Sequence, residues 1–477
     1  WYQRRVRGIA KDGRLVFQAA LKANQNITLS NTVLNTTLEL VLTVSGGRCD
    51  IRGVTRRKTS FRIGFVSKIF TSGGLERVTQ LLATNLAASG HTLFVITGPA
   101  HEKDYALPDN VRRVVLADFD NMILGMTEIA RLQLDVIVFQ QYYTMENYEY
   151  INSYARNGMK VVAIDHNVYL WALIDNPQFV NPQTLTTTRE IEAQRHKYYP
   201  IADAVAVLSP FDALVWQRAG VRARYIPNPT TYPVHDIEDR SGKNVLWVGR
   251  MQNIKQPGMA LDMMKTLNAI NPAANLVMVG DLHHEMAWYV ERDNIANVQV
   301  HGFTLDIDRF YKNASVLVIT SQYEGYGMVI AEALSHGVPV VSFEMPYLTL
   351  MSCGVVQVEK SNVAQMAHEV NKLLQNETRR QKLAKFGQEC LQKQNELVVP
   401  RWNELLSKVV NGEEVDFPDE ADEKWVDDIL FEEVKFLFNA TDRQMMEAKR
   451  RQKEEHRRQK AQERIQKRVN NIQKKKR

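Results

Sequence analysis

Two glutamates stand eight residues apart in an apolar, glycine-rich stretch, SQYEGYGMVIAEALSHGVPVV (residues 321–341). Glu324 follows an apolar run that predicts a buried strand, and Glu332 lies within a predicted helix that ends at Gly337. Carboxylates in such a place can accept hydrogen bonds from the vicinal hydroxyl groups of a ribose and of a sugar. The simpler interpretation is that one of them matches the positive end of the helix dipole, an effect of about 0.3–1 kcal/mol.

Two cations follow another predicted strand. In LWVGRMQNIKQPG (residues 246–258), Arg250 and Lys255 come shortly after the strand, next to Gly249. A guanidinium can bind two oxygens at once, so a fixed pair of cations beside a glycine suits a diphosphate. The alternative is an ordinary pair of surface cations that face solvent.

A pair of glycines opens a predicted helix in FVSKIFTSGGLERVTQLL (residues 65–82). Gly73 and Gly74 would let the backbone approach a ligand closely, and the first turn of the helix would present free N–H groups to an anion. A plain turn between a strand and a helix would have the same pattern.

The elements that must position these residues are two series of strands that alternate with amphipathic helices. The strands are continuous apolar runs, which is typical of parallel sheets covered on both faces. The sequence therefore predicts an α/β fold with two doubly wound, Rossmann-like domains, whose ligands bind beyond the carboxyl ends of the strands. The predicted boundaries are a small β-rich segment over 1–60 that ends in a basic linker (52–60), a first domain over 61–228, a second over 229–410, and an acidic linker with a basic helical or disordered tail over 411–477.

Taken together, these motifs resemble the retaining GT-B-type glycosyltransferases, in the large group that contains bacterial glycogen synthases, sucrose synthases and envelope-polysaccharide transferases. The resemblance rests on the order of the Gly-Gly loop, the IPNP segment (226–229), the Gly-Arg-x4-Lys run and the Glu-x7-Glu run. It covers about residues 61–410, and the first sixty residues and the tail lie outside it.

The resemblance implies a role for each matching position. Arg250 and Lys255 would hold the donor diphosphate, Glu324 would bind hydroxyls of the donor sugar, and His166 would lie near the reacting sugar. The remaining expected donor contacts are with the phosphates, the ribose and the base, through Gly73, Gly74, Gly249, Asp281, Gly302, Phe303, Gly327, Met328 and Glu332.

No metal site is expected. The triplet Asp118-Phe119-Asp120 is similar to the metal-binding DxD of another glycosyltransferase fold, but it falls in the first domain, away from the predicted phosphate site. His283-His284 is interpreted as part of an exposed helix. The chain also shows no convincing protein nucleophile, which suits the family's same-face displacement with retained configuration. The only cofactor-like molecule expected is the nucleotide sugar itself.

Charge is distributed unevenly along the chain. The overall net charge is +6, yet residues 442–477 hold 15 Lys/Arg against 5 Asp/Glu, and residues 1–60 hold 11 against 3. A uniformly nucleic-acid-binding protein is thereby excluded, and no nucleic-acid partner is expected. The tail could be a solvated segment, or it could bind an anionic membrane surface or an acidic partner.

Three cysteines, Cys49, Cys353 and Cys390, are few and far apart in the chain. Their number and spacing predict a reduced compartment without a disulfide framework. The expected location is the cytoplasm, with a peripheral position at the inner face of the membrane if the tail binds lipid.

The sequence therefore predicts a retaining hexosyltransferase that moves a sugar from a nucleotide donor, UDP-linked by expectation, to a glycan, glycolipid, teichoic-acid-like or protein-linked acceptor. Two alternatives remain open. A non-hydrolysing UDP-sugar epimerase shares the two-domain architecture and needs no acceptor. A scaffold protein could bind the sugar nucleotide without catalysis.

Overall fold

The structure is a computed structural model. It describes the course of the backbone over parts of residues 8–57, and beyond them it describes residues 58–71, 73–119, 122–140, 153–155, 158–171, 192–237, 242–250, 253–281, 283–415, 421–433 and 435. The predicted basic tail lies outside the described residues.

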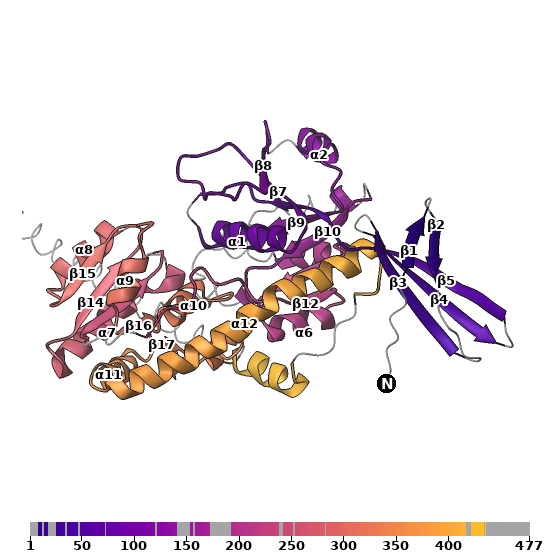
Figure 1. Cartoon of the computed structure of the whole chain (residues 1–477). Coiled ribbons are helices and arrows are strands. Elements are labelled where there is room, and N and C mark those ends of the chain that lie inside the picture. Colours follow the sequence, from indigo (N-terminus) through magenta and orange to yellow (C-terminus); the bar gives the residue numbers. More distant parts are fainter. Residues whose placement is uncertain are drawn as a thin grey trace, which may run out of the picture.

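A seven-stranded sheet forms the first Rossmann-like unit (Figure 1). Its strand order is β12-β11-β10-β9-β6-β7-β8, and each neighbouring pair is parallel. The order reverses beside β6, as the doubly wound fold requires. The strands are β6 (Arg62–Val66), β7 (Thr92–Thr97), β8 (Val111–Val115), β9 (Val136–Gln140), β10 (Lys160–Ile164), β11 (Ala204–Val207) and β12 (Ala223–Tyr225).

A six-stranded parallel sheet forms the second unit, in the order β15-β14-β13-β16-β17-β18. The central strands are fully buried, as their continuous apolar runs predict. The strands are β13 (Asn244–Val248), β14 (Asn275–Val279), β15 (Val298–His301), β16 (Val316–Ile319), β17 (Val340–Phe343) and β18 (Val356–Val358). The predicted fold class is confirmed.

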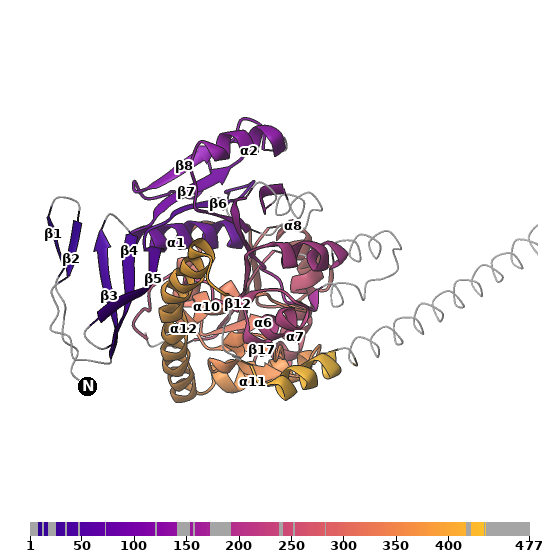
Figure 2. The ribbon, with the colours of Figure 1, turned by 90° about the vertical axis from the view of Figure 1, so that its right-hand side faces the viewer.

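Helices cover the faces of both sheets (Figure 2). In the first unit these are α1 (Gly74–Ala88), α2 (Met122–Ala130) and α6 (Pro210–Arg218), with the 3-10 helix η2 (Tyr199–Ile201). In the second unit they are α7 (Pro257–Ile270), α8 (His283–Arg292), α9 (Asp308–Asn313), α10 (Met328–Ser335) and α11 (Val363–Leu374), with η3 (Asn253–Lys255) and η4 (Thr349–Ser352).

The long helix α12 (Glu377–Asn411) runs along both units (Figure 1). Its first half packs on α10 and α11 of the second unit. Its second half returns to the first unit, where Trp402, Leu405 and Leu406 are buried in the same core cluster as β6. This helix therefore ties the two sheets together, whereas the predicted domain boundary at 228/229 stays a prediction.

The described residues between Gly8 and Lys58 form strands, as the sequence predicts, and the paired strands are antiparallel. Residues of β1 (Gly8–Lys11) pair with β2 (Arg14–Phe17), and β3 (Gln25–Val33), β4 (Thr36–Ser45) and β5 (Arg48–Lys58) form a separate sheet. The predicted basic linker over 52–60 is wrong, because most of it is β5. The arginines favoured the prediction of a linker, but the backbone of this segment pairs with β4 along its length.

Cys353 and Cys390 form a disulfide, so the predicted absence of one is wrong. The bond links the end of η4 to α12, and the two residues are 37 positions apart in the sequence. Their pairing depends on how α12 packs against the second unit, which the spacing of cysteines in the chain does not reveal.

No helix of the described part of the chain is both long enough and apolar enough to cross a membrane.

Candidate active site

An ion pair lies at the carboxyl edge of the second sheet. Lys255 Nζ contacts both carboxylate oxygens of Glu324, at 2.6 and 2.7 Å, and Ser321 Oγ donates to Glu324 Oε1 at 2.6 Å. The side chains of Lys255 and Glu324 are 26% and 11% exposed. One predicted diphosphate ligand and one predicted sugar ligand are thus in direct contact.

The position of Lys255 is set by the strand ends around it. Thr320 directly follows β16, and its hydroxyl accepts from Trp247 Nε1 of β13 at 2.9 Å. The same hydroxyl lies 2.8 Å from the carbonyl oxygen of Lys255, to which it can donate. The fully buried Trp247 therefore anchors η3 to the sheet through one threonine. Such anchoring holds the ammonium group where Glu324 can reach it.

Glu332 lies inside α10, and both of its carboxylate oxygens accept a hydrogen bond. Thr231 Oγ1 donates to Oε1 at 3.0 Å, and the Tyr311 hydroxyl donates to Oε2 at 2.8 Å. Burial raises the pKa of Glu332, and the bonds from Tyr311 and Thr231 act in the opposite direction. A carboxylate so held has a fixed orientation and retains lone pairs that can accept from further hydroxyls.

The loop before α10 carries the other predicted donor contacts of this strand end. Gly327 has φ +81° and precedes the helix, and Met328 begins it. The Met328 sulfur accepts from Asn228 Nδ2 at 3.7 Å, so the helix start is tied to the IPNP segment between the two sheets. Met328 also packs against two core clusters, one that spans both sheets and one that lies in the first unit with α12.

Charges from the two units face each other around Gly73. The carboxylate of Glu76, in the first turn of α1, folds back over Gly73, where Oε2 occupies the space that a Cβ would need. Burial raises the pKa of Glu76, and the positive charge of Arg250 from the second unit opposes that shift. Arg250 is exposed, and it follows β13 and Gly249 as predicted. The Gly73-Gly74 loop of the first unit and Arg250 of the second unit thus lie on opposite sides of the boundary between the two units.

His166 follows β10 in the first sheet. Its Nε2 is hydrogen-bonded to the side-chain oxygen of Gln140 at the end of β9. Burial lowers the pKa of His166 to about 4, so the imidazole is neutral at pH 7. Beside it, the carboxylate of Asp165 pairs with the fully buried Arg195 at 2.5 Å and accepts from the backbone N–H of Asn167 at 3.2 Å. This ion pair fixes the loop that carries His166.

The two half-sites touch through backbone atoms. A Cβ placed on Gly325 would lie 1.9 Å from the carbonyl oxygen of His166, which no real side chain could tolerate. Gly325 is the residue directly after Glu324. The sugar-binding glutamate predicted in one unit and the histidine predicted in the other are therefore brought to one place, and the contact requires a glycine.

The predicted base-pocket residues lie along the edge of the second sheet. Asp281 comes two residues after β14, and Gly302 and Phe303 follow β15. The ring of His283 packs against Gly302, at 3.0 Å from the position of a Cβ. Phe303 is 53% exposed, so its ring is accessible to a planar ligand. Asp118 is exposed in the first unit, and the side chain of Asp120 lies outside the described residues.

Sequence reasoning missed several polar residues around Glu332. Thr231 and Tyr311 bond to it directly, and Arg77 of α1 is near enough for its charge to lower the pKa of Glu332. Arg77 also lies over the ring of Tyr105 at 5.4 Å. The position of Arg77 one residue after Glu76, in the first turn of a helix at the sheet's ligand edge, is the signal that could have revealed it.

Comparison with known proteins identifies the family. Residues 72–231 match a family model described as Glycosyltransferase Family 4, and residues 242–376 match one described as Glycosyl transferases group 1. Together the two matches cover more than half of the chain, one on each sheet. The chain belongs to the GT-B glycosyltransferases.

Two curated relatives of this glycosyltransferase are themselves named as glycosyltransferases of bacteria. An amylovoran biosynthesis glycosyltransferase of Erwinia amylovora is 27% identical over 36% of the chain, and the match spans half of that protein. An α-1,4-N-acetyl-D-galactosaminyltransferase of Campylobacter jejuni, named for a PP-undecaprenol-linked substrate, is 24% identical over 57% of the chain and 76% of its own length.

A solved structure with the same fold is HepE from Anabaena in complex with UDP-glucose. It is 15% identical, covers 74% of this chain and all of its own, and has a TM-score of 0.55. At this identity the likeness shows the GT-B fold of the glycosyltransferase and nothing finer.

Proposed function

We propose that the glycosyltransferase is a retaining hexosyltransferase that uses a UDP-linked sugar. The observation that carries this proposal is the Lys255–Glu324 pair at the carboxyl edge of the second sheet, in backbone contact with the His166 loop of the first. A sugar nucleotide offers hydroxyls to Glu324 and a diphosphate to Lys255. Its anomeric carbon would then lie between the two units. UDP-glucose in the HepE structure supports the choice of donor.

The transfer breaks the bond between the anomeric carbon and the phosphate oxygen, and the electron pair remains on the departing diphosphate. The acceptor hydroxyl forms the new bond to the same carbon from the same face and gives its proton to the diphosphate. Negative charge therefore develops on the diphosphate, where fixed cations stabilise it most. Arg250 and Lys255 would supply that stabilisation, and we propose that no Mg²⁺ or Mn²⁺ bridges the phosphates.

Neutral His166 would act beside the sugar rather than on the phosphates. Its ring is held by Gln140 and its carbonyl oxygen is pressed against Gly325. Such a ring can exchange hydrogen bonds with a sugar hydroxyl without adding charge at the reacting carbon. Closure of the two backbones around it would exclude water and limit hydrolysis of the donor.

The acceptor class is proposed as a glycan, a glycolipid, a teichoic-acid-like polymer or a protein-linked sugar. The Campylobacter relative, which is named for a PP-undecaprenol-linked substrate, supports the lipid-linked member of this set. The basic tail over 442–477 would hold the enzyme at an anionic membrane surface of the cytoplasm, where such acceptors lie. Co-sedimentation with anionic vesicles tests this last point, because a chain that ends at Asn439 should lose salt-sensitive binding that the full chain retains.

Thermal stability in a panel of nucleotide sugars tests the donor, because a ligand that binds only the folded state raises the melting temperature by mass action. The stabilising donor is then incubated alone and with candidate acceptors, and the anomeric configuration of the product is read by NMR. We expect retained configuration and no change of the donor when it is alone. Epimerisation of the donor alone would favour the epimerase alternative, and donor binding without turnover on any acceptor would favour the scaffold.

A further inference from the structure

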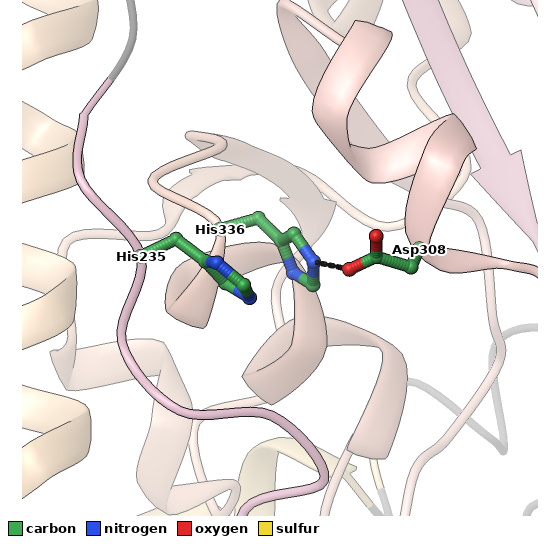
Figure 3. A group of neighbouring side chains, drawn as sticks. All are labelled: His235, Asp308 and His336. Atoms are coloured by element: carbon green, nitrogen blue, oxygen red, sulfur yellow. Dashed lines mark hydrogen bonds and ion pairs between the residues drawn. The ribbon is translucent and has the colours of Figure 1, made fainter.

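Three potential metal ligands that are distant in the sequence gather behind Glu332 (Figure 3). His235 comes from the segment after β12, Asp308 begins α9, and His336 follows α10. One ligand atom from each lies within 4.8 Å of the others. The residues are spread over a hundred positions of the sequence, which is why sequence analysis predicted no metal site.

The hydrogen bonds of His336 leave a place for a cation. Nδ1 lies 2.7 Å from the carbonyl oxygen of Glu332, and Nε2 lies 2.8 Å from Asp308 Oδ1. A carbonyl oxygen only accepts, so the ring hydrogen of neutral His336 belongs on Nδ1. Nε2 then turns a lone pair toward a carboxylate oxygen, which is favourable only with a proton or a metal ion at that nitrogen.

The surroundings have the features that orient metal ligands. A ligating histidine usually donates its other N–H to a carbonyl or carboxylate, as His336 does to Glu332. Lys312 holds the second oxygen of Asp308 at 2.5 Å, which leaves Oδ1 directed at His336. Tyr311 stacks on the His336 ring at 5.1 Å between centroids. These contacts fix the tautomer and the orientation of two of the three ligands.

The third ligand, His235, has a fixed backbone. Its N–H donates to the carbonyl oxygen of Ser335 at 2.9 Å, and Gln388 of α12 donates to the carbonyl oxygen of His235 at 2.7 Å. The His235 ring stacks on that of His336 at 4.4 Å, as Figure 3 shows. A turn of the His235 side chain would bring its nitrogen toward an ion beside His336 Nε2.

We propose that His235, Asp308 and His336 bind a Zn²⁺ ion, with water in the fourth position. Two imidazoles and a carboxylate are a typical zinc ligand set, with metal–ligand distances of about 2.0–2.2 Å. Binding would draw together ligand atoms that now lie up to 4.8 Å apart. His336 is fully buried and the Asp308 side chain is 31% exposed, so the ion would enter from the side of Asp308.

The ion would act on Glu332 without touching the donor. His336 is bonded to the backbone of Glu332, and Tyr311 links the His336 ring to the Glu332 carboxylate. Zinc would join α9, the end of α10 and the segment after β12 into one support for the predicted ribose ligand. This role is separate from the proposed metal-free chemistry at the diphosphate.

Zinc binding by the full chain, without an affinity tag, tests the proposal. The protein is stripped with a chelator and titrated with Zn²⁺ against a chromophoric competitor. We compare the wild type with His235→Ala and Asp308→Asn, two changes at residues that are not fully buried. A His283→Ala/His284→Ala double variant is the matched control, because these adjacent histidines of α8 are another candidate for adventitious binding.

We expect one tightly bound Zn²⁺ per wild-type chain and in the control. Each single variant should weaken binding by more than about 100-fold, because loss of outer partners alone costs 10–100-fold in metal affinity. Co²⁺ in the same site should give the absorption of a tetrahedral complex. The proposal is overturned if the wild type binds no zinc, if the single variants bind as tightly as the wild type, or if only the α8 control loses the ion. If the wild type binds no zinc, the contact between His336 and Asp308 is only a salt bridge.

Discussion

The loop after β10 and the loop after β16 touch at Gly325, yet they are held in different ways. In the first loop, His166 is half-buried, neutral and bonded to an amide, while the neighbouring Asp165 pairs with Arg195. In the second, Glu324 is ionically paired with Lys255. Burial without a partner charge selects the neutral form of a group, whereas a close opposite charge retains the ionised form. The difference favours the proposal that the ionic pair serves the donor diphosphate through Lys255 and the sugar hydroxyls through Glu324, whereas neutral His166 serves the uncharged sugar alone.

The largest expected effect is a loss of turnover on removal of a cation at the predicted diphosphate site. Lys255→Ala removes the ammonium that would stabilise the departing diphosphate, and such a loss costs about 2.7–4 kcal/mol of transition-state stabilisation, or about 100- to 1,000-fold in turnover. Arg250→Ala should act in the same direction. Lys265→Ala is the control, because Lys265 pairs with Asp262 and Asp293 on the exposed side of α7. Near-normal turnover in both site variants would contradict the assignment of Lys255 and Arg250 to the donor diphosphate.

The next expected effect concerns His166 and is a pH dependence of the free energy of unfolding. His166 has a folded pKa of about 4 against an ordinary value of 6.5, so the unfolded chain binds more protons between these values. His166 therefore contributes stability that is full above pH 6.5 and is lost as the pH falls toward 4, by about 3 kcal/mol in all. The free energy of unfolding is measured across this range in the wild type and in His166→Gln. The difference between the two slopes isolates this residue, and identical slopes would show that His166 is not held neutral.

The contact between the two loops can be broken directly. Gly325→Ala places a methyl group against the His166 carbonyl oxygen and must push the loops apart. A displacement of about 1 Å in a reacting geometry can cost about 100-fold in rate, and we expect turnover to fall by that order. Gly258→Ala is the matched control, since a Cβ there meets no atom within 4 Å. If the two variants have the same turnover, the contact does not position the site.

The smallest effect separates the two glutamates. Glu332→Gln removes one ionic acceptor for the ribose, and we expect UDP affinity to fall by about 1.5 kcal/mol, roughly tenfold. Glu324→Gln should leave UDP affinity close to that of the wild type while it lowers turnover, because its partner is the sugar. Calorimetry with UDP distinguishes them. Equal losses of affinity would mean that the two roles are wrongly assigned.

The sequence predicts the sheets well where each strand is a continuous apolar run, as in β9 and β16. It does not predict β12 and β18, which have three residues each. It also misreads β5, because the arginines within this strand look like a basic linker. The local hydrophobic pattern therefore predicts the buried central strands. The other strands form because they pair with a neighbouring strand, which the local pattern does not show.

The site shows the same limit. Motif spacing predicts that Lys255 and Glu324 each lie at a strand end, but their direct contact joins residues 69 positions apart. The Cys353–Cys390 bond and the histidine cluster behind Glu332 depend on packing in the same way. The individual roles of the site residues stay predictions until they are tested.

Calorimetric titration of UDP into the wild type, Lys255→Ala and His166→Gln tests the division between the two loops most directly. If Lys255, which lies in η3 after β13 and pairs with Glu324 of the loop after β16, holds the charged part of the donor, Lys255→Ala should weaken UDP binding by about tenfold or more. His166→Gln should bind UDP as the wild type does and lose only turnover. A His166→Gln variant that loses as much UDP affinity as Lys255→Ala, or a Lys255→Ala variant that loses none, would contradict this account.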